Sequence, residues 1–273
     1  MTIIAISQEM GSCGYAIAAT VAKALNYDYV DRQMIVDAAE ADVLEAAIAE
    51  VADRRLSAWQ RFNEEKIRYR ALLDAAFFGF AEKDNVVTAG RRLAALVQGV
   101  SHAVRVRVIA PFEVRVERIM KHDHLDHGKA VHKIWEYDRD ITARISSLFG
   151  PEWLLPESYD LMINTVRDEP ALYADMVTAF ASYPRFVATP ASTQLVRNLS
   201  LAARVRAVLA RNLHTRSGVR LEVTADNGHV TLKGSIRHVS VQDALLTAVK
   251  DVPGVLSVSC EAVGVSRFHL PAT

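Results

Sequence analysis

The start of the chain joins a short apolar run to a helical segment through a turn that contains glycines. Ile3 to Ile6 is an uninterrupted apolar run, which is typical of a strand buried on both faces of a parallel sheet. Gly11, Ser12 and Gly14 interrupt this pattern, and Ile17 to Leu25 then shows helical spacing with many alanines. This order predicts an α/β domain with a mostly parallel sheet.

Strand and helix signals continue to alternate along most of the chain. Further strand candidates are Tyr27 to Val30, Asn85 to Thr88, Val104 to Ala110 and Tyr159 to Asn164. Helical patterns separate them, and two or three helices are expected between Gln33 and about Lys83. Alternation of this kind predicts a parallel sheet flanked by helices.

The composition restricts the class of protein. Hydrophobic residues make up 51% of the chain and charged residues 23%, so it can form a buried core. Its 32 basic residues equal its 32 acidic residues, which argues against nucleic-acid binding. The two cysteines, Cys13 and Cys260, are far apart in sequence, which fits a reducing compartment. No stretch resembles a signal peptide or a membrane span, so we expect a cytoplasmic protein.

The sequence changes character near residue 190. Residues 186–198 are interpreted as a linker, and Leu199 to Leu213 has the spacing of an amphipathic helix. The hairpin signal Asp226-Asn227-Gly228 follows between two alternating runs. Residues 195–273 carry 10 Lys/Arg and 5 Asp/Glu, whereas residues 1–194 carry 22 and 27. This difference supports a separate C-terminal domain and weakly supports an anionic partner for it.

The N-terminal turn has the form of a phosphate-binding loop without its usual charges. Backbone amides and the helix dipole stabilise phosphates in such a loop, and glycines allow close approach. A complete motif adds a lysine for the phosphates and a hydroxyl for the metal ion. Here Gly14 or Tyr15 stands at the lysine position and Ala16 at the hydroxyl position, which leaves Ser12 as the nearest hydroxyl. Similar turns also simply join strands to helices, so the pattern alone leaves phosphate binding open.

Several separated segments, in the right order, resemble the cytidylate kinase-like family, a branch of the P-loop nucleoside monophosphate kinases. These segments are Ile6 to Gly14, Tyr29 to Arg32, Val86 to Arg91, Ile109 to Ile119 and Phe149 to Thr165. The resemblance implies a P-loop kinase-like domain over residues 1–185, with a parallel sheet flanked by helices. It also implies a helical insertion that binds the monophosphate and a mobile lid near residues 121–144.

The resemblance further implies ATP and Mg²⁺ on the donor side and a (d)CMP-like nucleoside monophosphate as the acceptor. Asp31 and Arg32 would lie near the acceptor, although Asp31 could instead cap the helix that follows it. The residues that would cradle the donor phosphates are Gly11, Ser12, Cys13, Gly14 and Tyr15.

Three arginines are the candidates for offsetting charge during phosphoryl transfer, which depends on positioning and on cations. Arg91 would contact phosphate, or would be a solvated helix start. The lid positions where the family has arginines hold Asp140 and Ile141, so Arg139 and Arg144 are the nearby substitutes. Losing such cations weakens transfer. The sequence therefore allows two functions: a nucleoside monophosphate kinase, or a catalytically degenerate nucleotide sensor or scaffold.

Two further charged groups are interpreted as structural. Arg115 and Arg118 lie one helical turn apart and are expected to pair with Glu113 or Glu117 at the surface. A run of histidines and aspartates, at positions 122–132, is expected to be a polar, mobile loop. A metal site is the less favoured alternative, because only His124 with His127, or Asp123 with His127, has a suitable helical spacing. A pH-sensitive lid remains an alternative for this run because several imidazoles titrate near neutral pH.

Residues 199–265 resemble a BON domain, a small α/β module. The matching stretches are Asp226 to Ile236 and Val252 to Val255. The family is linked to membranes or hydrophobic ligands, so the resemblance implies an anionic lipid or a protein partner for this domain. The sequence shows no catalytic group there, and it leaves homo-oligomerisation open.

Overall fold

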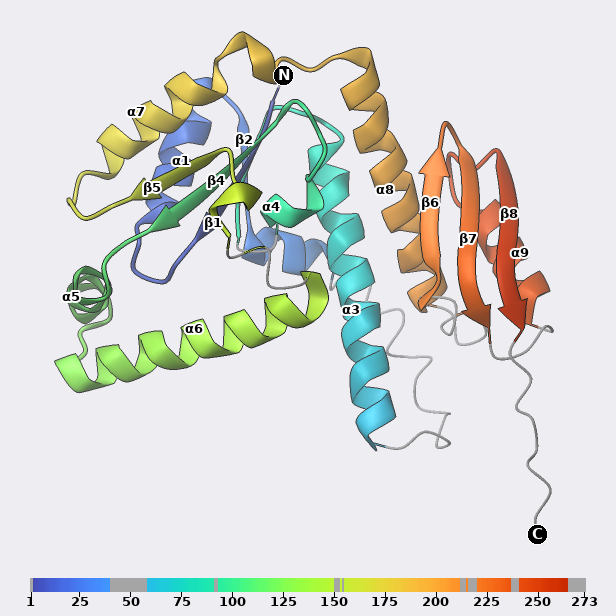
Figure 1. Ribbon diagram of the computed structural model, residues 1–273, viewed down its shortest axis with the longest axis horizontal. Helices are drawn as coiled ribbons and strands as arrows, with labels where there is room; N and C mark the ends of the chain where they lie inside the picture. Colours follow the sequence, from blue (N-terminus) through green and yellow to red (C-terminus); the bar gives the residue numbers. More distant parts are fainter. Residues whose placement is uncertain are drawn as a thin grey trace. The chain divides into compact units, whose positions relative to one another are not determined.

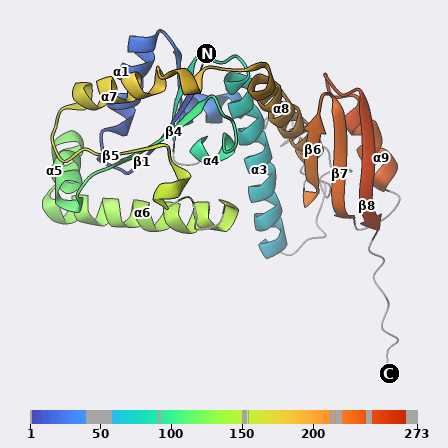
Figure 2. The same ribbon diagram turned by 45° about the horizontal axis from the view of Figure 1, so that its top comes forward.

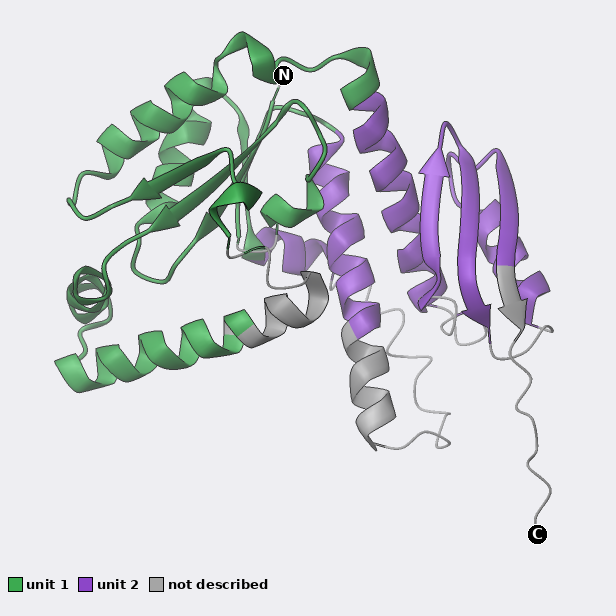
Figure 3. Ribbon diagram, viewed as in Figure 1, with its two compact units in different colours: residues 1–32, 83–192 green, residues 33–82, 193–273 purple. Residues whose placement is uncertain are grey.

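The computed structural model describes residues 2–39, 58–90, 93–149, 153, 155–211, 215, 220–236 and 241–264. The chain forms two compact units (Figure 3). Unit 1 comprises residues 1–32 and 83–192, and unit 2 comprises residues 33–82 and 193–273. Among the described helices, none combines the length and the apolar character that crossing a bilayer requires.

Unit 1 is built round a five-stranded sheet with the order β2-β3-β1-β4-β5 (Figure 1). All of its strand pairs are parallel, as the sequence predicts. The strands are β1 (Ile3–Gln8), β2 (Asp28–Asp31), β3 (Val86–Ala89), β4 (Ala103–Ile109) and β5 (Leu161–Asn164). Because β3 and β4 lie on opposite sides of β1, the carboxyl end of β1 is the switch point at which ligands bind in open α/β sheets.

Helices cover both faces of this sheet. α1 (Gly14–Leu25) and α7 (Pro170–Ala181) pack together on one side, and α6 (His127–Phe149) runs along the other (Figure 1 and Figure 2). α5 (Phe112–Asp123) packs against α6 through a small apolar cluster. The main core joins the buried faces of the sheet, α1 and α7. The short elements are α4 (Leu93–Leu96), η3 (Pro156–Ser158) and η4 (Pro184–Phe186).

Unit 2 contains a smaller mixed sheet with the order β6-β7-β8. β6 and β7 form an antiparallel hairpin, and its turn uses the positive φ angles of Asn227 and Gly228. β7 and β8 are parallel. One sheet face is apolar and packs on two helices. The elements are α8 (Pro190–Arg211), β6 (Glu222–Asp226), β7 (His229–Ile236), α9 (Val241–Lys250) and β8 (Ser257–Gly264).

The long helix α3 (Ala58–Ala81) packs against α8 within unit 2. Apolar contact between the helices includes small clusters around Leu72, Ala207 and Ala210. Polar contacts supplement it: Glu82 accepts hydrogen bonds from Ser200 at 2.7 Å and from Arg204 at 3.3 Å. The segment that precedes β3 therefore packs on α8, a helix of the C-terminal unit.

The start of α8 differs from the expected linker over residues 186–198. The helix begins at Pro190, whereas the sequence pattern places its start at Leu199. Pro190 suits the first helical position. The hydroxyl of Thr189 accepts a bond from the Ser192 amide at 3.2 Å, and the Ser192 hydroxyl accepts one from the Thr189 amide at 2.9 Å. This reciprocal cap fixes the early start, and the domain boundaries at 1–185 and 199–265 stay a prediction.

Candidate functional site

The turn between β1 and α1 lies at the switch point of the parallel sheet. Gly11 and Cys13 both have positive φ angles, 77° and 61°. A side chain at Gly11 would come within 2.9 Å of the Arg115 carbonyl on α5, so only glycine fits there. Ser12 closes the turn, because its amide and its hydroxyl both donate to the Glu9 carbonyl, at 3.1 and 2.8 Å.

Gln8 lies over the first residue of α1. A Cβ atom at Gly14 would lie 2.5 Å from the Gln8 Cβ and 2.1 Å from its side-chain oxygen. Burial raises the pKa of Tyr15, and a hydrogen bond from Gln8 partly opposes this. Gln8 and Tyr15 therefore form a neutral, hydrogen-bonded pair beside Gly14, and no space is left there for the stem of a lysine.

Cys13 is part of the turn, and its thiol lies in an environment that favours the protonated form. It is the N-cap residue of α1, and its sulfur lies 3.8 Å from Asp168. Burial raises the pKa of the Cys13 thiol, and Arg118 only partly opposes this effect. A raised pKa keeps the sulfur protonated near neutral pH, so its contribution to the site is its backbone conformation.

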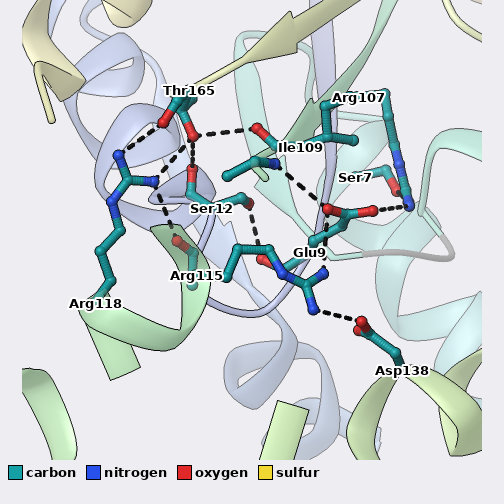
Figure 4. Close-up of polar contacts among 11 residues, drawn as sticks. Ser7, Glu9, Ser12, Arg107, Ile109, Arg115, Arg118, Asp138 and Thr165 are labelled. Atoms are coloured by element: carbon teal, nitrogen blue, oxygen red, sulfur yellow. Dashed lines mark hydrogen bonds and ion pairs between the residues drawn. The ribbon is translucent and has the colours of Figure 1, made fainter. Parts of the chain in front are cut away.

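Glu9 is the centre of a group of ion pairs beneath the turn (Figure 4). Its carboxylate lies 3.4 Å from Arg107 and 3.2 Å from Arg115. Arg107 also donates to the Ser7 hydroxyl at 2.9 Å, and Arg115 also pairs with Asp138 on α6. The buried cations nearest the turn are thus engaged with protein carboxylates, and Arg115 ties the turn to α6.

A second arginine holds the opposite side of the turn. Arg118 donates to the Gly11 carbonyl at 3.2 Å and to the Thr165 carbonyl at 2.7 Å (Figure 4). The Thr165 hydroxyl is buried, and it lies 2.9 Å from the Ser12 carbonyl. Side chains from α5 and from the end of β5 therefore fix two successive carbonyl groups of the turn.

Tyr15 and the end of β2 belong to the same region. Burial raises the pKa of Tyr29 to about 12, with further contributions from the charges of Asp31 and Tyr15. The charge of Arg32 lowers the pKa of Tyr15, and the charge of Asp31 raises it. The predicted donor loop and the predicted acceptor residues are thus close enough to interact electrostatically, at the carboxyl ends of β1 and β2.

The comparisons with known proteins agree with this arrangement. Residues 3–167 match the cytidylate kinase-like family. The chain belongs to this family. Residues 199–263 match the BON domain. No curated protein matches the sequence. The family match and the strand order together establish a P-loop kinase-like α/β unit joined to a small BON domain.

Three solved structures that are similar to this chain have TM-scores below 0.5. An uncharacterized protein from Eubacterium ventriosum ATCC 27560 is 16% identical, with a TM-score of 0.49 over 66% of this chain and 98% of that one. TT1252 from Thermus thermophilus is 16% identical, with a TM-score of 0.43 over 66% and 96%. Shikimate kinase from Acinetobacter baumannii, in complex with shikimate, is 14% identical, with a TM-score of 0.36 over 66% and 92%. Scores below 0.5 do not define a shared fold by themselves.

Of the three arginines that the sequence predicts to be catalytic, the structure describes the side chain of one, Arg139. Arg91 lies outside the described residues, and so does the side chain of Arg144. Arg139 is exposed on α6, where it pairs with its neighbour Asp140 at 3.3 Å. Its role as a lid cation stays a prediction.

The histidine-rich run forms separate surface pairs. His122 pairs with Asp123 at 2.8 Å, and His127 and His132 lie near Glu113 and Glu136, each at 3.6 Å. In the part of the chain that the structure describes, no three His, Cys, Asp or Glu side chains are grouped as metal ligands. Most of this run is helical, at the end of α5 and the start of α6, which corrects the expected mobile loop.

The expectation that Arg115 and Arg118 form surface pairs was wrong. Arg115 is only 3% exposed, and both arginines face the turn. Sequence reasoning also missed Glu9, Arg107 and Thr165. One signal was available: Arg107 interrupts the apolar strand β4, where a buried charge requires a partner. The identity of that partner depends on the register between β4 and β1, which places Arg107 beside Ser7.

Proposed function

We propose that unit 1 is a nucleotide-binding domain whose turn at residues 11–15 receives the donor phosphates. The observation that carries the proposal is the turn itself, which lies at the switch point of a cytidylate kinase-like sheet and leads directly into α1. The first amides of a helix have no intrahelical acceptors, and together with the helix dipole they favour an anion. ATP is the donor nucleotide that this proposal names.

The acceptor side is assigned to the end of β2. Asp31 and Arg32 are close enough to Tyr15 for their charges to affect its pKa. A guanidinium group suits a phosphate, and tyrosine rings suit a base. These features support phosphoryl transfer to a (d)CMP-like nucleoside monophosphate, with Arg91 and the lid arginines offsetting charge on the transferred group.

Mg²⁺ would accompany ATP in such a reaction and would neutralise its phosphates. The oxygen ligands of the described turn do not fit the ion as they stand. The Ser12 hydroxyl donates to the Glu9 carbonyl, and the Glu9 carboxylate is held by Arg107 and Arg115. We therefore assign no step to the metal.

A second candidate function is a nucleotide sensor without turnover. The observation that favours it is the Gln8 side chain over Gly14, which takes the place of a phosphate-binding lysine. Arg115 is likewise engaged with Glu9 and Asp138. Such a protein would bind ATP, transfer the phosphoryl group slowly or not at all, and signal through its BON domain to an anionic lipid or a protein partner.

Thermal-shift titration of the full chain with ATP·Mg²⁺ and with CMP distinguishes these functions. Binding of both ligands with ADP release above background supports the kinase. Binding without ADP release supports the sensor, and no shift with any nucleotide contradicts nucleotide binding. Flotation of the full chain with anionic and with neutral liposomes tests the lipid partner.

A further inference from the structure

Arg118 and Thr165 together form a polar clamp on the turn. The Arg118 side chain is 13% exposed, and its guanidinium donates only to oxygens of the turn and of the segment after β5 among the contacts described. It reaches the Gly11 carbonyl at 3.2 Å and the Arg167 carbonyl at 3.1 Å. One largely enclosed cation thus joins three separate stretches of chain.

Thr165 completes the clamp from the end of β5. Its amide donates to the Ile109 carbonyl at 2.8 Å, which anchors the residue to β4. Its fully buried hydroxyl accepts a bond from Arg118 at 3.1 Å, and its single proton faces the Ser12 carbonyl at 2.9 Å and the Ile109 carbonyl at 3.1 Å. The position of the hydroxyl is therefore fixed by the sheet rather than by the turn.

The direction of these carbonyl groups determines the direction of the amides that follow them. In a trans peptide the C=O and the next N–H point in opposite directions. The carbonyls of Gly11 and Ser12 point toward the clamp, so the amides of Ser12 and Cys13 point away from it. The Ser12 amide accordingly reaches the Glu9 carbonyl. The Cys13 amide points away from Thr165 in the same way, next to the first amides of α1.

We propose that Arg118 and Thr165 are positioning residues for phosphate binding: by holding the carbonyls of Gly11 and Ser12, they aim the Cys13 amide and the start of α1 at the phosphates of the nucleotide. This inference rests on the proposed nucleotide-binding function. It goes beyond it by assigning the orientation of the turn to two side chains that do not themselves contact the ligand.

The test compares ATP affinity in Thr165→Val and Thr165→Ser variants of the full chain, measured by titration calorimetry. Valine keeps the shape but removes the hydroxyl, and we expect the dissociation constant to rise about tenfold, as for the loss of one hydrogen bond. Serine keeps the hydroxyl and should restore the affinity to within about twofold. Thr178→Val on α7 is the matched control, because no hydrogen-bond partner of its hydroxyl is found in the described structure.

Hydrogen exchange gives a second readout that a merely structural role would not change. ATP should protect the amides of residues 13–16 in the wild type and in Thr165→Ser, but not in Thr165→Val at the same nucleotide concentration. Arg118→Lys, which cannot span the same set of carbonyls, should behave like Thr165→Val.

The results that would contradict the positioning role differ from those that would contradict nucleotide binding. Wild-type protein that binds ATP, with Thr165→Val binding equally well, overturns the positioning role alone. Equal losses in the valine and serine variants overturn it too, because packing would then be responsible. Wild-type protein that does not bind ATP overturns the proposed function and this inference together.

Discussion

At the scale of the residue, the turn after β1 is shaped by neutral side chains in places where a phosphate-binding loop commonly carries charge. Gln8 and Tyr15 are hydrogen-bonded to each other beside Gly14. Their contact depends on the absence of a side chain at Gly14. The glycine at this position is thus explained by the close approach of Gln8, and its φ angle is not positive.

Gly14→Ala should destabilise the protein by about 1–3 kcal/mol, because the new methyl group would overlap the Gln8 side chain. Chemical denaturation measures the change. Gly79→Ala is the control, since nothing lies within 4 Å of that site on α3 and alanine favours a helix. An unchanged unfolding midpoint in Gly14→Ala would show that Gln8 moves aside without cost.

The phenol of Tyr29 should lose its proton at a higher pH than an ordinary tyrosine does. Its pKa is raised from 10.0 to about 12, mainly by burial, so the folded state holds the proton more tightly than the unfolded state. Stability from this group is therefore fully present below pH 10 and is lost as the pH rises toward 12. An absorbance titration of phenolate should show a late step that Tyr29→Phe removes. Tyr183→Phe, at an exposed position, should retain this step, and an unchanged titration in Tyr29→Phe would contradict the assignment.

At the scale of the element, α6 is tied to the turn by one buried arginine. Arg115 on α5 pairs with Glu9 on one side and with Asp138 on the other. α5 and α6 also share an apolar cluster. The helix expected to act as a lid is therefore held through charge as well as through packing.

Asp138→Ala should loosen this contact and lower the stability of unit 1 by about 1–3 kcal/mol, because it removes one partner of a buried guanidinium. Hydrogen exchange should increase along α5 and α6 but not in β1 or β3. Lys129→Gln breaks an exposed pair on the same helix and should have little effect. Equal exchange in both variants would mean that packing alone holds α6.

The start of α8 offers a separate prediction. Thr189→Ala removes one half of the reciprocal cap with Ser192 and should cost about 1 kcal/mol. Thr189→Ser should retain most of the stability. Thermal unfolding of the two variants gives the comparison, and equal melting temperatures would show that Pro190 alone fixes the start of the helix.

At the scale of the whole molecule, the division into units does not follow the order of the sequence. The segment 33–82 lies between β2 and β3 in sequence, yet it groups with the C-terminal sheet unit. This segment meets α8 through polar contacts such as that of Glu82, the residue after α3, with Ser200, which is 1% exposed. The segment 33–82 and the C-terminal sheet therefore belong to one compact unit, in which α3 packs on α8.

Glu82→Ala tests this contact between the segment 33–82 and α8. It should leave the buried Ser200 hydroxyl and Arg204 without their acceptor, which costs about 1–3 kcal/mol. Hydrogen exchange should increase in α3 and α8 together and should stay unchanged in β1 to β5. Glu113→Gln, at an exposed position on α5, is the control. An increase confined to α8 would contradict the grouping.

Much of the architecture could be predicted because the signals are local. The apolar run Ile3–Ile6, the glycines of the turn and the Asn227-Gly228 hairpin each determine the backbone within a few residues. The residues of the turn could be identified for the same reason. Arg115 and Thr165 could not be identified, since their roles depend on which elements meet in space.

The sequence by itself determined the alternation of strands and helices, the position of the turn and the presence of a second domain, because these follow from hydrophobic period and turn chemistry. Only the tertiary structure decided that Arg115 is buried, that Arg118 and Thr165 hold the turn, and that α3 packs on α8. The physical reason is that the sequence of a helix does not decide whether a charged side chain on it faces water or forms an ion pair with a carboxylate. The choice is made by packing between elements that are far apart in the chain.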